Sequence, residues 1–236
     1  MLLSPADFDV VFAPLRGATV YYAPNPGNVG DVMIELGTRE LFEVFDIRVT
    51  GDLEAADRLL LGGGGSWGNE YDWIRAARCR YLDVAQTLGV DAVVLPQSVR
   101  WPDAEPVSSA VRRFFVRERA SLPLIPTATL APDLALAYTP DVACGRSVYA
   151  RGVFLRTGPE ALFSARTDGN LGDPITMVDP ASKEDAVRSY IGLASAYRHV
   201  VTDRLHFATA ALLAGRRVTL LPNVYHKNRS MYDTWL

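Results

Sequence analysis

The sequence predicts an α/β protein made of two small, doubly wound, Rossmann-like halves of unequal size that face a cleft. Short apolar runs alternate with amphipathic stretches along the whole chain, the pattern of strands and helices layered on a mostly parallel sheet. Near-continuous apolar runs such as Ala92–Leu95 suit strands that are covered on both faces. Pro140 and Gly145 interrupt any regular element, so we expect an N-terminal domain at 1–140 and a C-terminal domain at 141–236.

The first domain is expected to alternate strands with helices that return the chain to one edge of the sheet. Its first strand, Thr19–Ala23, leads through a turn rich in Pro and Gly into the first long helix. A later apolar run ends in four consecutive glycines. We predict strands at 19–23, 46–50, 58–65, 91–98 and 114–121, and helices at 31–45, 69–88 and 104–113.

The second domain repeats this alternation on a smaller scale. Ser182 before Lys183 is a good helix start, and Gly215 after an apolar helix is a good helix stop. The polar segment 226–236 forms a last helix that can cross back to the first domain. We predict strands at 151–157, 175–179, 199–203 and 216–222, and helices at 182–197 and 205–215.

Composition excludes several classes of protein. Hydrophobic residues make up 49% of the chain, which is too many for a disordered protein. The 24 basic and 27 acidic residues nearly balance, which argues against a nucleic-acid partner. Cys79 and Cys144 stand in no metal-binding spacing and are too few for a disulfide framework.

No apolar run approaches the roughly 18–20 residues of a membrane span. The start of the chain has no basic region typical of a secretory signal. We therefore expect a cytoplasmic protein, either free or peripheral to the inner face of the membrane.

Ligands of doubly wound sheets bind beyond the carboxyl ends of the strands, and two candidate sites follow strands of the first domain. The segment Pro24–Asp31 carries Gly27 and Gly30 and opens a helix, whose free N–H groups attract an anion. Asp31 can act on a ligand or simply cap this helix. The run Gly62–Gly65 has no side chains, so it either lets a ligand approach the backbone or forms a tight turn.

Two further strand ends of the first domain carry polar side chains. Gln97 and Ser98 place short hydrogen-bonding groups toward the predicted cleft. Arg117 directly follows an apolar strand and can clamp a carboxylate or a phosphate. Alternatively, Arg117 pairs internally with Glu118 or Asp133.

A strand end of the second domain carries the sharpest signal. The segment Val200–Phe207 combines Arg204 with His206 in the first turn of an apolar helix. A lone histidine is usually a structural residue, but a neighbouring arginine and the positive helix N-terminus favour an anion here. His206 is therefore our first candidate for catalysis.

Together these residues resemble the polysaccharide pyruvyl transferase family. The resemblance rests on an ordered set of short motifs, of which Arg-Leu-His is the most diagnostic. The motifs are Asn28-x-Gly30-Asp31, Gly62–Gly65, Val116-Arg117-Glu118 with Ser121, Asp203-Arg204-Leu205-His206, Pro222 and Lys227. The resemblance implies a fold similar to the two-domain architecture of type B glycosyltransferases. It also implies transfer of a pyruvyl group from phosphoenolpyruvate to a sugar, as a cyclic ketal across two hydroxyls.

The same resemblance implies roles for individual residues. It suggests His206 as a catalytic or donor-contacting imidazole. From the chemistry of ketal formation we expect His206 to act as general acid and base, and Asp31, as a secondary candidate, to orient or deprotonate the acceptor hydroxyl. The donor-binding residues would be Arg117, Arg204, Leu205, Ser121 and Lys227. The residues of the acceptor side or the cleft would be Asn28, Gly30, Gly63, Gly64, Gln97 and Ser98. Phosphoenolpyruvate would be a substrate, so we expect no metal and no cofactor. The partners would be this small donor and a sugar acceptor linked to a nucleotide, a lipid or a polymer.

Two other functions fit the same sequence. A type B glycosyltransferase with a nucleotide-sugar donor has a similar architecture, and it would need a ribose-binding acid such as Asp179 or Glu184. A non-catalytic module that binds a sugar or an anion would also keep the cleft. Four aromatic residues can either form a sugar-stacking wall near the cleft or pack in the core: Trp67, Tyr71, Trp73 and Trp101.

Overall fold

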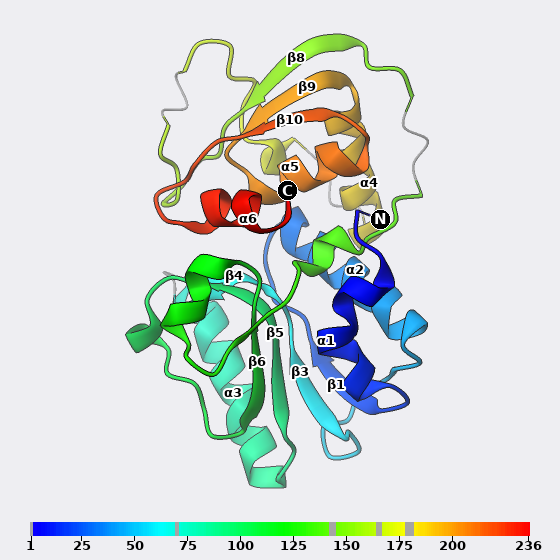
Figure 1. Ribbon diagram of the computed structural model, residues 1–236, viewed down its shortest axis with the longest axis vertical. Helices are drawn as coiled ribbons and strands as arrows, with labels where there is room; N and C mark the ends of the chain where they lie inside the picture. The colour runs from blue at the N-terminus through cyan, green and yellow to red at the C-terminus, as the bar shows by residue number, and fades with distance from the viewer. Residues whose placement is uncertain (1, 69–70, 142–144, 164–166, 178–181) are drawn as a thin grey trace.

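Two parallel β-sheets form the framework of the protein, and Figure 1 shows the smaller sheet above the larger one. The computed structural model describes residues 2–68, 71–141, 145–163, 167–177 and 182–236. The strands are β1 (Thr19–Ala23), β2 (Arg48–Thr50), β3 (Arg58–Leu61), β4 (Gly64–Trp67), β5 (Ala92–Val99), β6 (Val111–Val116), β7 (Thr129–Leu130), β8 (Tyr149–Phe154), β9 (Tyr197–Thr202) and β10 (Arg217–Leu220). The larger sheet has the order β2-β1-β3-β5-β6-β7, with β4 paired to β5, and the smaller has the order β10-β9-β8. All of these strand pairs are parallel.

Helices cover these sheets and fill the space between them. The helices are α1 (Asp9–Phe12), α2 (Val29–Val44), α3 (Asp72–Leu88), α4 (Lys183–Ser195), α5 (Leu205–Leu213) and α6 (Lys227–Trp235). Helices α1 and α2 pack on one face of the larger sheet, and α3 packs on the other. Helices α4 and α5 lie on the side of the smaller sheet that faces the larger one (Figure 1). The predicted α/β fold with Rossmann-like parallel sheets is confirmed.

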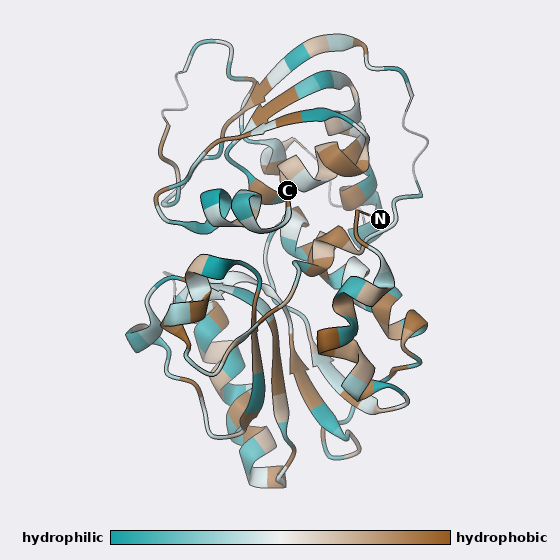
Figure 2. Cartoon of the chain, viewed as in Figure 1, coloured by the Kyte–Doolittle hydropathy of each residue, from teal (hydrophilic) through white to brown (hydrophobic). Residues whose placement is uncertain are grey.

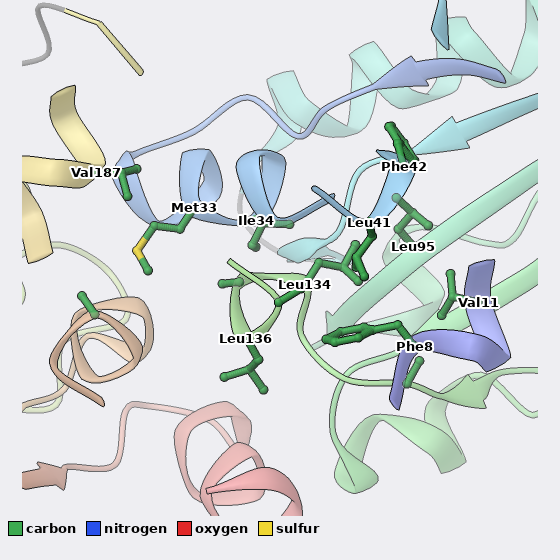
Figure 3. Close-up of a cluster of buried hydrophobic side chains, with 14 of the residues drawn as sticks. Phe8, Val11, Met33, Ile34, Leu41, Phe42, Leu95, Leu134, Leu136 and Val187 are labelled. Carbon is green, nitrogen blue, oxygen red and sulfur yellow. The ribbon is translucent and has the colours of Figure 1, made fainter. Parts of the chain in front are cut away.

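One apolar core joins the two sheets. It includes Phe12 and Leu41 from the larger-sheet side, and Phe154, Tyr190 and Phe207 from the smaller-sheet side. Figure 3 shows part of this cluster, in which Met33 of α2 and Val187 of α4 are labelled. A second core lies between the larger sheet and α3, and it contains the fully buried Trp67. Figure 2 shows the hydrophobic colour over much of β3 and β5 in the larger sheet and the hydrophilic colour over most of α6.

Helix α2 begins at Val29, two residues before the predicted start, because a capping box fixes its first turn. The Asn28 side chain accepts a hydrogen bond from the Gly30 N–H at 2.9 Å, and Asp31 accepts one from the Asn28 N–H at 3.0 Å. These two bonds satisfy N–H groups that a helix start leaves unpaired. The capping role that the sequence allows for Asp31 is therefore present.

The predicted helix at 104–113 is wrong. Only Pro102–Ala104 is helical, as a short 3-10 turn, and Val111–Val116 forms the strand β6. The second half of β6, with two phenylalanines and a valine, is buried and pairs with β5. Such residues favour a covered strand. The predicted strand at 114–121 consequently ends at Val116, and Arg119–Leu124 forms a 3-10 helix, η4.

Other elements also differ from the prediction. The predicted strand at 58–65 is split into β3, which pairs with both β1 and β5, and β4, which pairs with β5. The predicted strand at 175–179 is wrong in its described part, since Pro174–Thr176 forms a 3-10 helix that the Asp173 side chain caps; residues 178–179 lie outside the described residues. Two short helical segments at 5–8 and 9–12 precede β1 and have no counterpart in the prediction.

The last helix contacts the larger-sheet side of the molecule. The indole N–H of Trp235 in α6 donates to the Arg117 carbonyl at 2.6 Å, and the Ala120 N–H donates to the Ser230 hydroxyl at 3.1 Å. These bonds connect α6 to the segment that follows β6. The division of the chain at residue 140 stays a prediction. Among the described helices, none is long and apolar enough to cross a membrane.

Candidate functional site

A cavity of about 400 Å³ lies where the carboxyl ends of strands from both sheets meet. Asn25 follows β1, Arg117 follows β6, Arg156 follows β8 and Arg204 follows β9. The residues that line it on the larger-sheet side are Asn25, Gly27, Asn28, Asp31, Gly65, Ser66, Tyr71, Trp73, Ile74 and Arg117. The residues that line it from the remainder of the chain are Arg156, Glu160, Tyr190, Arg204, Leu205, His206 and Lys227. The position beyond the strand ends is the one that parallel α/β sheets use for ligands.

Arg117 lies in a buried cluster at one end of the cavity. Its Nη1 donates to Asp133 Oδ2 at 2.6 Å, its Nε donates to Ser98 Oγ at 2.8 Å, and its Nη1 lies 3.4 Å from His206 Nε2. Burial alone would raise the pKa of Asp133, but Arg117 and His206 together hold that pKa well below its usual range. The internal ion pair expected for Arg117 is therefore present, with Asp133 as the partner, and Arg117 also lines the cavity. Its role as an anion clamp stays a prediction.

His206 projects from the first turn of α5 with only 15% of its side chain exposed. Its Nε2 lies 3.4 Å from Asp133 Oδ2. On the opposite side of the ring, the Gly30 backbone of α2 lies so close to Nδ1 that a Cβ at that position would overlap it. Gly30 therefore lets α2 approach His206, and it does not itself line the cavity.

Arg204 is the N-cap residue of α5, and Asp173 holds its side chain at the cavity. Arg204 Nε donates to Asp173 Oδ1 at 2.9 Å, and Nη2 donates to the second carboxylate oxygen. Such a bidentate pair fixes the plane of the guanidinium. Burial raises the pKa of Asp173, but the hydrogen bonds from Arg204 and the Thr157 N–H outweigh it and lower that pKa.

Glu160 holds two further cations at the cavity wall. Its Oε2 accepts hydrogen bonds from Arg156 Nη1 and Lys227 Nζ, each at 2.5 Å. Burial opposes the charged carboxylate, but Lys227 and Arg156 bring the pKa of Glu160 to about 2. Burial lowers the pKa of Lys227 to about 8, against the opposing attraction of Glu160.

Asp31 caps α2 and also lines the cavity. Burial raises the pKa of its carboxyl, while His206 and the hydrogen bond from the Asn28 N–H act in the opposite direction. A carboxyl with a raised pKa beside an imidazole is a candidate for proton transfer. Asn28 and Leu205, also predicted for this site, line the cavity as well.

Gln97 and Ser98 were expected to face the cleft, but they do not line the cavity. Their side chains are buried beneath it. Gln97 Nε2 donates to the Gly62 carbonyl at 2.6 Å, which fixes the glycine run. Ser98 Oγ accepts from Arg117 and donates to Glu118 Oε2 at 2.8 Å. Both residues therefore support the wall instead of forming it.

Ser121 is likewise buried behind the wall, where its hydroxyl donates to Glu118 Oε1. The same hydroxyl accepts from the Val99 N–H at 2.9 Å. Gly63 and Gly64 also do not line the cavity, whereas the next glycine, Gly65, does. A Cβ at Gly65 would come within 2.7 Å of Arg117 Nη2, so the glycine run makes room for that guanidinium.

Several cavity residues were missed from the sequence. Arg156 follows an apolar strand, the same signal that singled out Arg117. Glu160 and Tyr190 follow no such pattern, because a loop and a helix face bring them to the cavity. Asn25 and Ser66 flank motifs that were recognised, but neither was singled out.

The four aromatic residues divide between wall and core. Tyr71 and Trp73 line the cavity, Trp67 packs edge-on against Phe114 in the core, and Trp101 is exposed outside the cavity wall. Of the two acids considered for a ribose, Glu184 lies in the first turn of α4 and does not line the cavity. Asp179 lies outside the described residues. Within the described ranges, no group of three or more His, Cys, Asp and Glu residues could hold a metal ion.

Comparison with known proteins shows the fold and the family of this chain. A curated relative from Bacillus subtilis (strain 168) is named "Putative pyruvyl transferase EpsO". It is 23% identical to this chain over an alignment of 280 residues, and the match covers 94% of this chain and 86% of the relative. The crystal structure of protein KP1_0663 from Klebsiella pneumoniae subsp. pneumoniae NTUH-K2044 matches with a TM-score of 0.74 and 21% identity, over 99% of this chain and 94% of that one, and it supports the fold. The family model described as "Polysaccharide pyruvyl transferase" matches residues 7–223, and the chain therefore belongs to the polysaccharide pyruvyl transferase family.

Proposed function

We propose that this member of the family transfers a pyruvyl group from phosphoenolpyruvate to two hydroxyls of one sugar, with release of phosphate. Membership of the family supports pyruvyl transfer to a polysaccharide or its precursor. The observation that carries the donor assignment is the convergence of Arg117, Arg204 and Lys227 with His206 in one cavity. Phosphoenolpyruvate holds a carboxylate and a phosphate close together, and guanidinium groups match both anions.

The proposed reaction begins with a proton transfer to the CH2 carbon of the donor, which leaves positive charge on C2. One sugar hydroxyl adds to C2 and loses its proton, and phosphate leaves with the electrons of the C2–O bond. The second hydroxyl then closes the ketal ring. Of the two hydroxyl protons, one ends on the new methyl group and the other on the phosphate, so the step needs no oxidant, reductant or cofactor.

In this proposal His206 is the general acid and base, because its ring nitrogen faces the Arg117–Asp133 pair in the cavity. Arg117 and Arg204 hold the donor anions and stabilise the phosphate as it leaves. Asp31 orients or deprotonates an acceptor hydroxyl, a role that its raised pKa favours. The acceptor is a sugar linked to a nucleotide, a lipid or a polymer.

The test is incubation of the protein with phosphoenolpyruvate and a panel of free and nucleotide-linked sugars, with EDTA present throughout. We expect release of inorganic phosphate and, by mass spectrometry, a product that is heavier by one ketal-linked pyruvyl group. Phosphoenolpyruvate that stays intact with every sugar would contradict the proposal. Consumption of a nucleotide sugar instead would favour the glycosyltransferase alternative.

A further inference from the structure

One part of the cavity wall is uncharged and aromatic. Tyr71 and Trp73, at the start of α3, and the buried Ile74 line this side. Trp73 is 58% exposed although it lines the cavity, so a large part of its indole faces open space. Burial raises the pKa of the Tyr71 phenol, which keeps its hydroxyl neutral.

Two uncharged polar side chains, Asn25 and Ser66, complete this wall and are held in place. Asn25 Nδ2 donates to Ser66 Oγ at 3.0 Å, and Arg78 Nη1 donates to the same hydroxyl at 2.8 Å. Arg78 is itself fixed by a buried ion pair with Glu105, at 2.8 and 2.6 Å. The Ser66 hydroxyl in turn donates to Asn25 Oδ1 at 3.3 Å, so it holds the Asn25 amide in place and leaves one N–H of Asn25 Nδ2 for a ligand. A buried, fully paired guanidinium thus orients an amide at the cavity surface, as in a prepared binding wall.

We propose that this wall, made of Tyr71, Trp73, Asn25 and Ser66, binds the pyranose ring of the acceptor. A pyranose has an apolar C–H face that suits an aromatic surface and a rim of hydroxyls that needs neutral hydrogen-bonding partners. The donor has two anionic groups, which match the cations of the lining, Arg117, Arg204 and Lys227, better than these uncharged side chains. The assignment of this sugar as the acceptor rests on the proposed function, whereas sugar binding to the wall can be measured without turnover.

The experiment is saturation-transfer NMR on the full chain with four probes. They are methyl β-D-glucopyranoside, methyl β-D-galactopyranoside, methyl N-acetyl-β-D-mannosaminide and uridine. We expect at least one pyranoside to bind to the wild type, with the strongest transfer to its ring C–H protons. Trp73→Ala should weaken this binding at least about tenfold, which corresponds to about 1.4 kcal/mol, and Trp73→Phe should restore part of it.

Trp101→Ala is the matched control, because Trp101 is an indole with 45% exposure outside the cavity wall. This variant should bind the pyranoside as the wild type does. The proposal is overturned if Trp73→Ala binds the pyranoside as tightly as the wild type does. It is also overturned if Trp101→Ala loses as much affinity as Trp73→Ala, or if uridine is the only probe that binds. Absence of binding by all three pyranosides would overturn it too.

The outcome for this wall is separable from that of the proposed function. If a pyranoside binds through Trp73 but phosphoenolpyruvate is never cleaved, the sugar subsite stands and the donor assignment fails. If phosphate is released with a sugar whose KM is the same in Trp73→Ala, the reaction stands and the subsite fails.

Discussion

His206 is the residue on which the proposed chemistry most depends. Its Nε2 lies 3.4 Å from Arg117 Nη1 and 3.4 Å from Asp133 Oδ2. His206→Ala should lower kcat for phosphate release by about 10²–10⁴-fold, the usual effect of losing a general acid. The Arg117–Asp133 ion pair does not need the imidazole, so thermal stabilisation by phosphoenolpyruvate should largely persist in this variant. A kcat near that of the wild type would rule out the role of His206.

Lys227 gives the donor site an expected pH dependence. Its pKa is lowered to about 8, so the buried ammonium loses its proton as the pH rises through that value, well below the ordinary lysine range. A neutral amine attracts the donor anions less, and the KM for phosphoenolpyruvate should therefore rise above about pH 8. Steady-state kinetics across that pH range are the measurement. Lys227→Gln should bind the donor weakly throughout and lack this rise; a rise of the same size in both proteins would exclude Lys227 as its cause.

At the scale of elements, the approach of α2 to α5 positions the imidazole. Gly30 allows that approach, because any side chain there would overlap the His206 ring. Gly30→Ala should destabilise the fold by about 1–3 kcal/mol through overpacking and should also reduce turnover. Urea unfolding measures the first effect and phosphate release the second.

Gly192→Ala is the matched control for that substitution. Gly192 also lies within a helix, α4, but a Cβ there would meet nothing within 4 Å. Its replacement should leave turnover unchanged and stabilise the fold by up to about 1 kcal/mol, the helix preference of alanine over glycine. If Gly30→Ala proves as stable as Gly192→Ala, the close packing of α2 against His206 does not determine how α2 packs against α5.

Much of the site could be predicted from the sequence because strand ends are easy to locate. Arg117 directly follows an apolar run, Arg204 comes two residues after the end of β9, and the carboxyl ends of parallel strands meet at one edge. What the pattern does not give is the direction of a side chain at that edge. Gln97 and Ser98 lie at a strand end too, but they point beneath the cavity, where they bind Gly62 and Arg117.

The errors in the elements have a common physical origin in tertiary pairing. The valine and phenylalanine residues of Val111–Val116 favour a strand, but its first half, with two arginines, becomes part of that strand by pairing with β5. The 3-10 turn at Pro174–Thr176 forms where Asp173 caps it and binds Arg204, a residue far along the chain. Glu160 was missed for the same reason, since its two cations come from different elements.

At the scale of the whole molecule, the two sheets share one apolar core as well as one cavity. Residues such as Leu41 and Phe207 belong to the same buried cluster although they lie on different sides of residue 140. We therefore expect one cooperative transition in calorimetry, with the calorimetric enthalpy equal to the van't Hoff enthalpy. Two separate transitions would show that the sheets unfold independently and that the shared core contributes little to their coupling.

In the proposed mechanism, one cavity between the sheets holds phosphoenolpyruvate beside the imidazole of His206. A crystal structure of the protein with phosphoenolpyruvate bound is the decisive measurement. We expect the donor's two anionic groups to lie on Arg117, Arg204 and Lys227, and its CH2 carbon to lie next to His206. Donor density in another part of the molecule, or in the cavity with its anions turned toward the aromatic wall, would contradict it.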